Sequence, residues 1–251
     1  MSQAFFRFYA ELNDFLPPYR RQVTFSSSFQ GNPSIKDAVE SLGVPHTEID
    51  LILINGVSVD FSHPVEDGDQ VSVYPVFEGL DIGSLVRLRP RPLRDPCFVL
   101  DTHLGRLATY LRLLGFDSLY RNDYGDEELA RISADEKRIL LTRDRGLLKR
   151  NLVTHGYCVR SSNPRRQIQE VVERFDLVEA AAPFKRCLRC NGLLKAVDKG
   201  EIAGRLPPNT RQYYQVFYGC TTCSQLYWRG SHYAALQRLI KEILTESTQQ
   251  I

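Results

Sequence analysis

The chain has 251 residues, of which 43% are hydrophobic and 25% are charged, a composition typical of soluble globular proteins with one large or several small domains. No apolar run approaches the ~18 residues of a membrane span, and the start of the chain lacks the basic and apolar regions of a signal peptide. We therefore expect a cytoplasmic protein with no membrane partner.

Charge is unevenly distributed along the chain. Residues 1–80 contain 4 Lys or Arg against 11 Asp or Glu, whereas the remainder contains 28 against 19. An acidic head followed by a basic body predicts at least two domains and a polyanionic partner. Chance segregation of surface charge is the alternative explanation.

Residues 1–80 predict a small domain of short strands around one helix. The strands are expected at 4–9, 22–25, 50–54, 57–60 and 70–74. Ser34 is a suitable N-cap for a helix through Ser41, and Gly43 should stop that helix. Asn55-Gly56 is a strong hairpin signal. This order of elements resembles a ubiquitin-like β-grasp domain.

The stretch LILINGVSVDFSHPVEDGDQVSVYPV within this head is similar to the sulfur-carrier proteins of thiamine and molybdopterin synthesis. Those carriers end in a free Gly-Gly carboxylate, whereas this chain continues through Glu78-Gly79-Leu80-Asp81. We therefore expect the head to be a binding or scaffolding module that recruits a protein partner, rather than a sulfur donor.

Residues 81–96 contain three prolines and four arginines, which predicts an extended linker. Strands and helices then alternate in a domain at 97–180. The strands are expected at 97–100, 118–120, 138–142 and 157–160, and the helices at 104–114, 126–136 and 162–173. This alternation predicts a parallel α/β sheet.

Carboxylates follow the predicted strands of this domain. Asp101 comes directly after the first strand, Asp126 begins the helix after the second, and Asp144 lies just beyond the third. Ligands of parallel α/β sheets bind at the carboxyl ends of the strands, so these residues should share one edge, with Asp123 as a fourth candidate. Clustered carboxylates favour Mg²⁺ or Mn²⁺, which can promote phosphodiester hydrolysis. The alternatives are an N-cap role for Asp126 and a simple surface charge for Asp144.

Four of the six cysteines form two C-x2-C pairs, Cys187 with Cys190 and Cys220 with Cys223, separated by 29 residues. Four thiolates can close a tetrahedral zinc site and leave no open position, so the zinc should be structural. Redox-active pairs and disulfides are the rival readings, and a reducing cytoplasm disfavours structural disulfides. Residues 181–251 are therefore predicted to be a zinc ribbon followed by a C-terminal helix, with a strand at 213–218 that leads into the second pair.

Two stretches carry a family resemblance: DTHLGRLATYLRLLGFDSLYRNDYGDEELARISADEKRILLTRDRGLLKR, and YWRGSHY after the second cysteine pair. Together they resemble the Mut-seven C-terminal ribonuclease domain, a PIN-like nuclease family, from about residue 98 to 239. The resemblance implies an RNA substrate, hydrolysis that leaves 5′-phosphate ends, and an acidic site at Asp101, Asp126 and Asp144. It also places Thr142, Arg143 and Arg145 beside that site as supporting or phosphate-contacting residues.

Other basic residues should neutralise RNA phosphates, although a solvated helix face explains them almost as well: Lys149, Arg165 and Arg166. Tyr213, Tyr214 and Trp228 are candidates for stacking on bases or for the core of the ribbon. The leading hypothesis is a metal-dependent ribonuclease. A separate hypothesis, motivated by the uneven charge, is that the acidic head shields the basic RNA surface. The alternative is a non-catalytic RNA-binding or regulatory adaptor whose β-grasp head recruits a partner.

Overall fold

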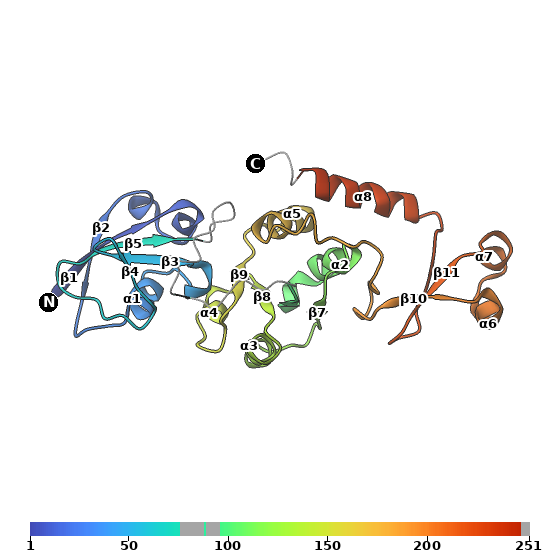
Figure 1. Cartoon of the computed structure of the whole chain (residues 1–251), viewed down its shortest axis with the longest axis horizontal. Helices are drawn as coiled ribbons and strands as arrows, with labels where there is room; N and C mark the ends of the chain where they lie inside the picture. Colours follow the sequence, from blue (N-terminus) through green and yellow to red (C-terminus); the bar gives the residue numbers. More distant parts are fainter. Residues whose placement is uncertain (76–87, 89–95, 247–251) are drawn as a thin grey trace. The chain divides into compact units, whose positions relative to one another are not determined.

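The computed structural model describes residues 1–75, 88 and 96–246. Most of the predicted linker at 81–96 therefore lies outside the described residues. The chain divides into two compact units, one of Met1–Asp95 with Gly125–Cys158 and the other of Pro96–Tyr124 with Val159–Ile251 (Figure 1). Each unit is described separately below.

The head is a five-stranded sheet in the order β2-β1-β5-β3-β4, with β1 antiparallel to β2 and parallel to β5. Its strands are β1 (Ser2–Phe8), β2 (Phe25–Phe29), β3 (Leu51–Ile54), β4 (Val57–Ser58) and β5 (Gln70–Tyr74). Its helices are η1 (Ala10–Phe15), η2 (Pro18–Arg20), α1 (Ile35–Ser41) and η3 (His46–Glu48). The predicted β-grasp fold is confirmed.

Capping residues and apolar patterns in the sequence explain the position of most of these helices and strands. Ser34 caps α1 by accepting a hydrogen bond from the Asp37 N–H, as predicted. The predicted strand at 22–25 is wrong in position, because β2 lies at Phe25–Phe29 and consists largely of serines. Pairing with the apolar strand β1 overrides their weak strand preference, and alternate β2 residues remain exposed.

The α/β domain is a four-stranded sheet in the order β7-β6-β8-β9, in which β6 pairs with β7 and β8 with β9 in parallel. Its strands are β6 (Phe98–Leu100), β7 (Ser118–Tyr120), β8 (Ile139–Thr142) and β9 (Gly156–Cys158). Its helices are η4 (Thr102–Leu104), α2 (Gly105–Leu113), α3 (Asp126–Asp135), α4 (Arg145–Leu148) and α5 (Pro164–Arg174). The predicted parallel sheet is therefore confirmed, whereas the one-turn helix α4 was not predicted.

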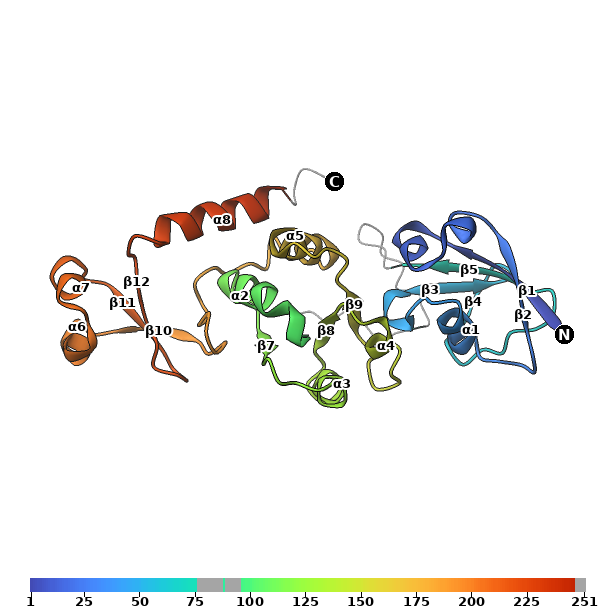
Figure 2. The same ribbon diagram turned by 180° about the vertical axis from the view of Figure 1, so that it is seen from behind.

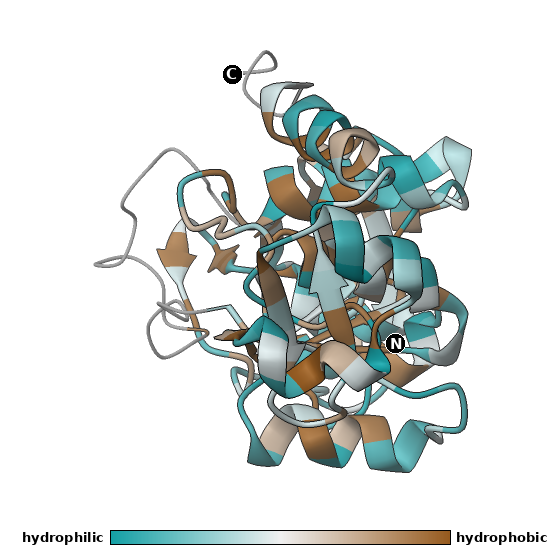
Figure 3. Ribbon diagram, turned by 90° about the vertical axis from the view of Figure 1, so that its right-hand side faces the viewer, coloured by the Kyte–Doolittle hydropathy of each residue, from teal (hydrophilic) through white to brown (hydrophobic). Residues whose placement is uncertain are grey.

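Figure 3 shows the alternation of hydrophobic and hydrophilic residues from which the helices could be predicted. Its helices carry hydrophilic and hydrophobic bands in alternation, the signature of amphipathic helices. In α2, Leu107 and Leu111 are fully buried, as their helical spacing predicts.

The C-terminal part is a three-stranded antiparallel sheet in the order β10-β11-β12, followed by a helix. Its elements are β10 (Leu194–Val197), α6 (Lys199–Ile202), η5 (Ala203–Arg205), α7 (Pro208–Tyr213), β11 (Phe217–Cys220), β12 (Leu226–Trp228) and α8 (Tyr233–Glu246). The predicted strand at 213–218 starts too early, because Pro208 opens α7, which runs to Tyr213. The helix α8 contacts α5, and the two are neighbours in both ribbon views (Figures 1 and 2). No described helix is long and apolar enough to span a membrane.

The C-terminal end of α2 holds the segment that leads to the ribbon. The carbonyls of Leu113 and Leu114 accept hydrogen bonds from the N–H groups of Phe184 and Ala182, at 3.1 and 2.8 Å. Gly115 then turns the chain with a φ of +98°, and a Cβ atom there would lie 2.2 Å from the Ala182 carbonyl oxygen. Only glycine fits this crossing without displacing backbone.

Gly115→Ala should therefore lower the free energy of unfolding by more than about 2 kcal/mol, because it combines an unfavourable φ with a backbone clash. Gly204→Ala is the matched control, since its added Cβ meets nothing within 4 Å. Urea unfolding of both variants would measure the difference. Equal stability of the two variants would contradict this account of the crossing.

Candidate functional site

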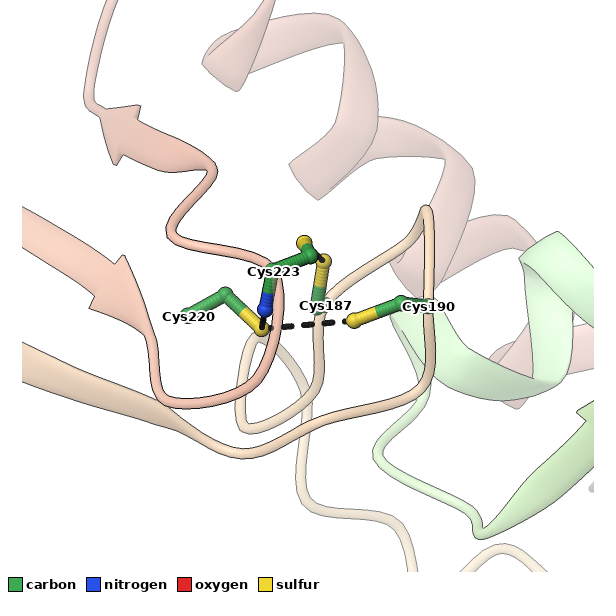
Figure 4. A group of neighbouring side chains, drawn as sticks. All are labelled: Cys187, Cys190, Cys220 and Cys223. Carbon is green, nitrogen blue, oxygen red and sulfur yellow. Dashed lines mark hydrogen bonds between the residues drawn. The ribbon is translucent and has the colours of Figure 1, made fainter.

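The four predicted zinc ligands lie together in the structure. The ligand atoms of Cys187, Cys190, Cys220 and Cys223 all lie within 4.8 Å of one another (Figure 4). The Sγ atoms of Cys187 and Cys223 are 3.6 Å apart, and those of Cys190 and Cys220 are 3.4 Å apart. A tetrahedron of Zn–S bonds of ~2.3 Å requires sulfur separations of about 3.8 Å. The thiol cluster therefore fits a metal such as zinc with little adjustment.

Two of the four thiols have pKa values that their surroundings shift in opposite directions. Burial raises the pKa of Cys220, but the N–H groups of Cys223 and Thr222 and the neighbouring thiols outweigh burial and leave that pKa at about 6. Burial and hydrogen bonds with the other three thiols raise the pKa of Cys190 to about 12. The thiol of Cys220 is thus more acidic than that of Cys190, and a bound cation would stabilise the thiolate of Cys190.

Two neighbours shape the cysteine cluster. The hydroxyl of Tyr227 lies 3.1 Å from the Sγ of Cys187 and accepts a hydrogen bond from the Leu188 N–H, also at 3.1 Å. Gly192 packs so closely that a Cβ atom would lie 2.9 Å from the Sγ of Cys220 and 2.5 Å from the Oγ1 of Thr222. Contacts of this kind orient metal ligands, and the sequence pattern alone did not identify Tyr227.

A buried arginine connects the first cysteine pair to the α/β domain. Arg112 on α2 is 4% exposed, and its Nε donates to the carbonyl of Ser118 at 2.9 Å. Its NH1 group donates to the carbonyls of Leu188 and Arg189, both at 3.2 Å. Burial lowers the pKa of Arg112, while Coulomb interactions with Cys190, Cys187 and Asp117 act in the opposite direction.

Asn191 and Arg186 add a second set of bonds between the same parts. The side chain of Asn191 accepts from the Ser118 N–H at 3.0 Å and donates to the Asp117 carboxylate at 2.9 Å. Arg186 pairs with the same carboxylate at 3.1 Å and donates to the Gly115 carbonyl at 3.2 Å. The turn that carries the first cysteine pair thus holds the start of β7 in place.

The predicted acidic residues fall in both units, Asp101 and Asp123 in one and Asp126 and Asp144 in the other. Asp101 directly follows β6, is 9% exposed, and caps η4 by accepting from the Thr102 N–H at 2.6 Å. Asp123 is exposed and forms a two-bond ion pair with Arg121, which lowers the pKa of its carboxyl group.

Asp144 and Asp126 are exposed residues at helix starts. Asp144 caps α4 by accepting from the Gly146 N–H at 2.7 Å, and its own N–H donates to the buried Thr142 Oγ1 at 2.9 Å. Thr142 therefore positions the Asp144 backbone. The N-cap of α3 is Gly125, so the expected capping role of Asp126 is wrong, and its carboxylate instead lies 3.6 Å from Arg150.

The predicted RNA-binding residues have different environments. Arg143 and Arg166 are exposed, and the exposed Arg165 forms an ion pair with Glu242 at 2.9 Å. Arg145, which is also exposed, and the half-buried Lys149 lie on or next to α4 and contact the β-grasp head. Among the aromatic candidates, Tyr214 and Trp228 pack against the ribbon core, whereas Tyr213 is 71% exposed.

Loss of the metal site should loosen β7, because Asn191 and Arg112 connect the knuckle to that strand. In Cys190→Ser we expect loss of bound zinc and at least ~10-fold faster hydrogen exchange at the Ser118 amide, since one hydrogen bond contributes about 1.5 kcal/mol. Cys97→Ser, a cysteine outside the cluster, should retain zinc and protection. Elemental analysis would measure the zinc content, and mass spectrometry would measure hydrogen exchange at the Ser118 amide. Unchanged protection of Ser118 in a zinc-free variant would contradict the proposed link between the cysteine site and β7.

The chain is similar to "Crystal structure of H. volcanii small archaeal modifier protein 1", with 16% identity, 31% of this chain and 100% of that chain covered, and a TM-score of 0.26. It is also similar to "Crystal structure of SAMP1 from Haloferax volcanii", with 17% identity, coverage of 32% and 100%, and a TM-score of 0.26. No curated protein matches the chain.

Two family models match consecutive parts of the chain. The Mut7-C ubiquitin model matches residues 1–81, and the Mut7-C RNAse domain model matches residues 96–240. The second match covers more than half of the chain and includes the four cysteines of the cluster and every predicted acidic residue. The protein therefore belongs to the Mut7-C RNAse domain family and carries a Mut7-C ubiquitin-like domain at its head.

Proposed function

We propose that the protein is a metal-dependent ribonuclease that hydrolyses RNA phosphodiester bonds at a carboxylate site formed by Asp101, Asp126 and Asp144, with Asp123 beside them. The observation that carries this proposal is the match to a ribonuclease family over residues 96–240, together with a carboxylate at each position that the predicted site requires.

The environment of Asp101 supports a functional role for this residue. A carboxylate that is 9% exposed and follows a fully buried strand is costly to desolvate and therefore needs polar partners or a cation. Its Oδ1 atom accepts from the Thr102 N–H and lies 3.2 Å from the Thr102 hydroxyl. These bonds fix the carboxyl group in one orientation, as a metal ligand requires.

The donor set fits hard cations. Asp101 follows β6 and Asp144 follows β8, and both offer carboxylate oxygens, the ligands that Mg²⁺ and Mn²⁺ prefer. When bound, such ions supply water activation and charge stabilisation for phosphodiester hydrolysis. The thiols of the ribbon are soft donors that suit zinc, so the two kinds of metal would occupy separate sites.

The chain's own residues would hold the RNA. Exposed Arg143 follows β8 and, together with Arg145 and Lys149, places positive charge on both sides of Asp144. Arg165 and Arg166 begin α5 and add further cations. Basic side chains of this kind neutralise phosphates without reading sequence, so binding should weaken as salt concentration rises.

Asp101→Asn and Asp144→Asn test the proposal without removing the helix caps, because asparagine is also a good N-cap. In each variant we expect cleavage of labelled RNA in Mn²⁺ or Mg²⁺ to fall by more than the ~10–100-fold that a lost outer contact costs. EDTA should abolish wild-type cleavage.

Asp135→Asn is the matched control, because Asp135 is an exposed carboxylate at the far end of α3. It should cleave RNA like the wild type. Equal activity of Asp101→Asn and wild type would place the site elsewhere. Inactivity of all proteins, with RNA binding retained, would favour a non-catalytic RNA-binding adaptor instead.

A further inference from the structure

A short polar helix of the β-grasp head is buried against the α/β domain. All three residues of η3, His46, Thr47 and Glu48, are at most 6% exposed, and η3 packs against β9. Polar groups are buried in this way only when partners replace their water. The contact is therefore specific, and it lies within a single compact unit.

His46 connects the two domains through both nitrogens of its ring. Its Nδ1 lies 2.6 Å from Oε1 of Glu40 on α1, within the head. Its Nε2 lies 2.8 Å from the carbonyl oxygen of Val153, in the loop before β9. The ring is oriented by one domain and bound by the other.

Glu48 makes the second connection, at a strand edge. β9 is the last strand in the sheet order, and the N–H of its residue Cys158 donates to Oε1 of Glu48 at 2.5 Å. An edge strand leaves backbone groups without strand partners, and a carboxylate that accepts from such a group forms a strong, charge-assisted bond. Because Glu48 is 1% exposed, this bond is shielded from water.

The head also engages the cations around α4. The guanidinium of Arg145 lies 4.8 Å from the ring centre of Phe15 and donates to the Phe15 carbonyl at 3.4 Å. The Lys149 ammonium donates to the Glu40 carbonyl at 2.6 Å, and Lys36 of the head bonds Asn151 at 2.8 Å. Two of the five proposed RNA-binding cations are thus held by the head, next to Asp144, the N-cap of α4.

From these contacts we propose that the β-grasp domain is an intramolecular competitor of RNA: docked through η3 on β9, it occupies Arg145 and Lys149, and RNA binds them only when the head has moved away. This inference rests on the proposed ribonuclease function. The acidic composition of the head suits a surface that a polyanion would otherwise occupy. Apparent RNA affinity then equals the intrinsic affinity reduced by the fraction of molecules with an undocked head.

The test uses zinc-loaded full-length protein that also carries Asp101→Asn, in EDTA-free buffer without added divalent ions, so that RNA stays intact. Glu48→Ala removes the buried bond to β9. We expect faster hydrogen exchange at the Cys158 amide and at least about tenfold tighter binding of a fluorescent single-stranded RNA, measured by anisotropy. Adding Lys149→Ala should cancel most of the gain. Unfolding of the head would also free Arg145 and Lys149, so a variant with an unfolded head must bind RNA more tightly as well.

Glu66→Ala is the matched control, because it removes the same charge from an exposed position of the head. It should change RNA affinity by no more than about twofold. Unchanged RNA affinity in a Glu48→Ala protein with faster Cys158 exchange would overturn the competition while leaving RNA binding intact. Unchanged exchange in both Glu48→Ala and His46→Ala would contradict the docking. Absence of RNA binding by every variant would instead count against the proposed function itself.

Discussion

A charged side chain that is buried must form hydrogen bonds or ion pairs inside the protein. Two such buried side chains connect the β-grasp head and the C-terminal ribbon to the α/β sheet. In one unit the buried guanidinium of Arg112 is matched by carbonyls at the start of β7 and in the turn that carries the first cysteine pair. In the other, the buried carboxylate of Glu48 is matched by the Cys158 N–H of β9. Loss of either pairing would leave a buried charge without its partner, so each contact stabilises the attached state of its domain.

The ribbon attachment has a consequence for the proposed active site. Arg112 lies on α2, and the same helix is preceded by η4, whose N-cap is Asp101. The hydroxyl of Tyr120 on β7 donates to the Thr102 carbonyl at 2.9 Å, which ties β7 to that turn as well. A metal held by the four cysteines would therefore support the position of Asp101 through α2 and β7.

Regular patterns were readable from sequence, and tertiary pairings were not. Leucine spacing predicted α2, and the cysteine spacing predicted the thiol cluster. The position of β2 was missed because its serines form a strand only through pairing with β1. Arg112 and Glu48 gave no signal, since a single charge in a helix or loop normally faces solvent. The four proposed acidic residues stay a prediction, because their arrangement depends on how the two units combine.

Manganese binding tests the central claim most directly, because it reports on the carboxylates independently of RNA and of turnover. Zinc-loaded full-length protein would be titrated with Mn²⁺, and free Mn²⁺ would be followed by electron paramagnetic resonance. The account predicts that wild type and Asp135→Asn bind Mn²⁺ at the acidic site and that the Asp101→Asn, Asp144→Asn double variant loses this binding. Equal Mn²⁺ binding by the double variant and the wild type would contradict the proposed site.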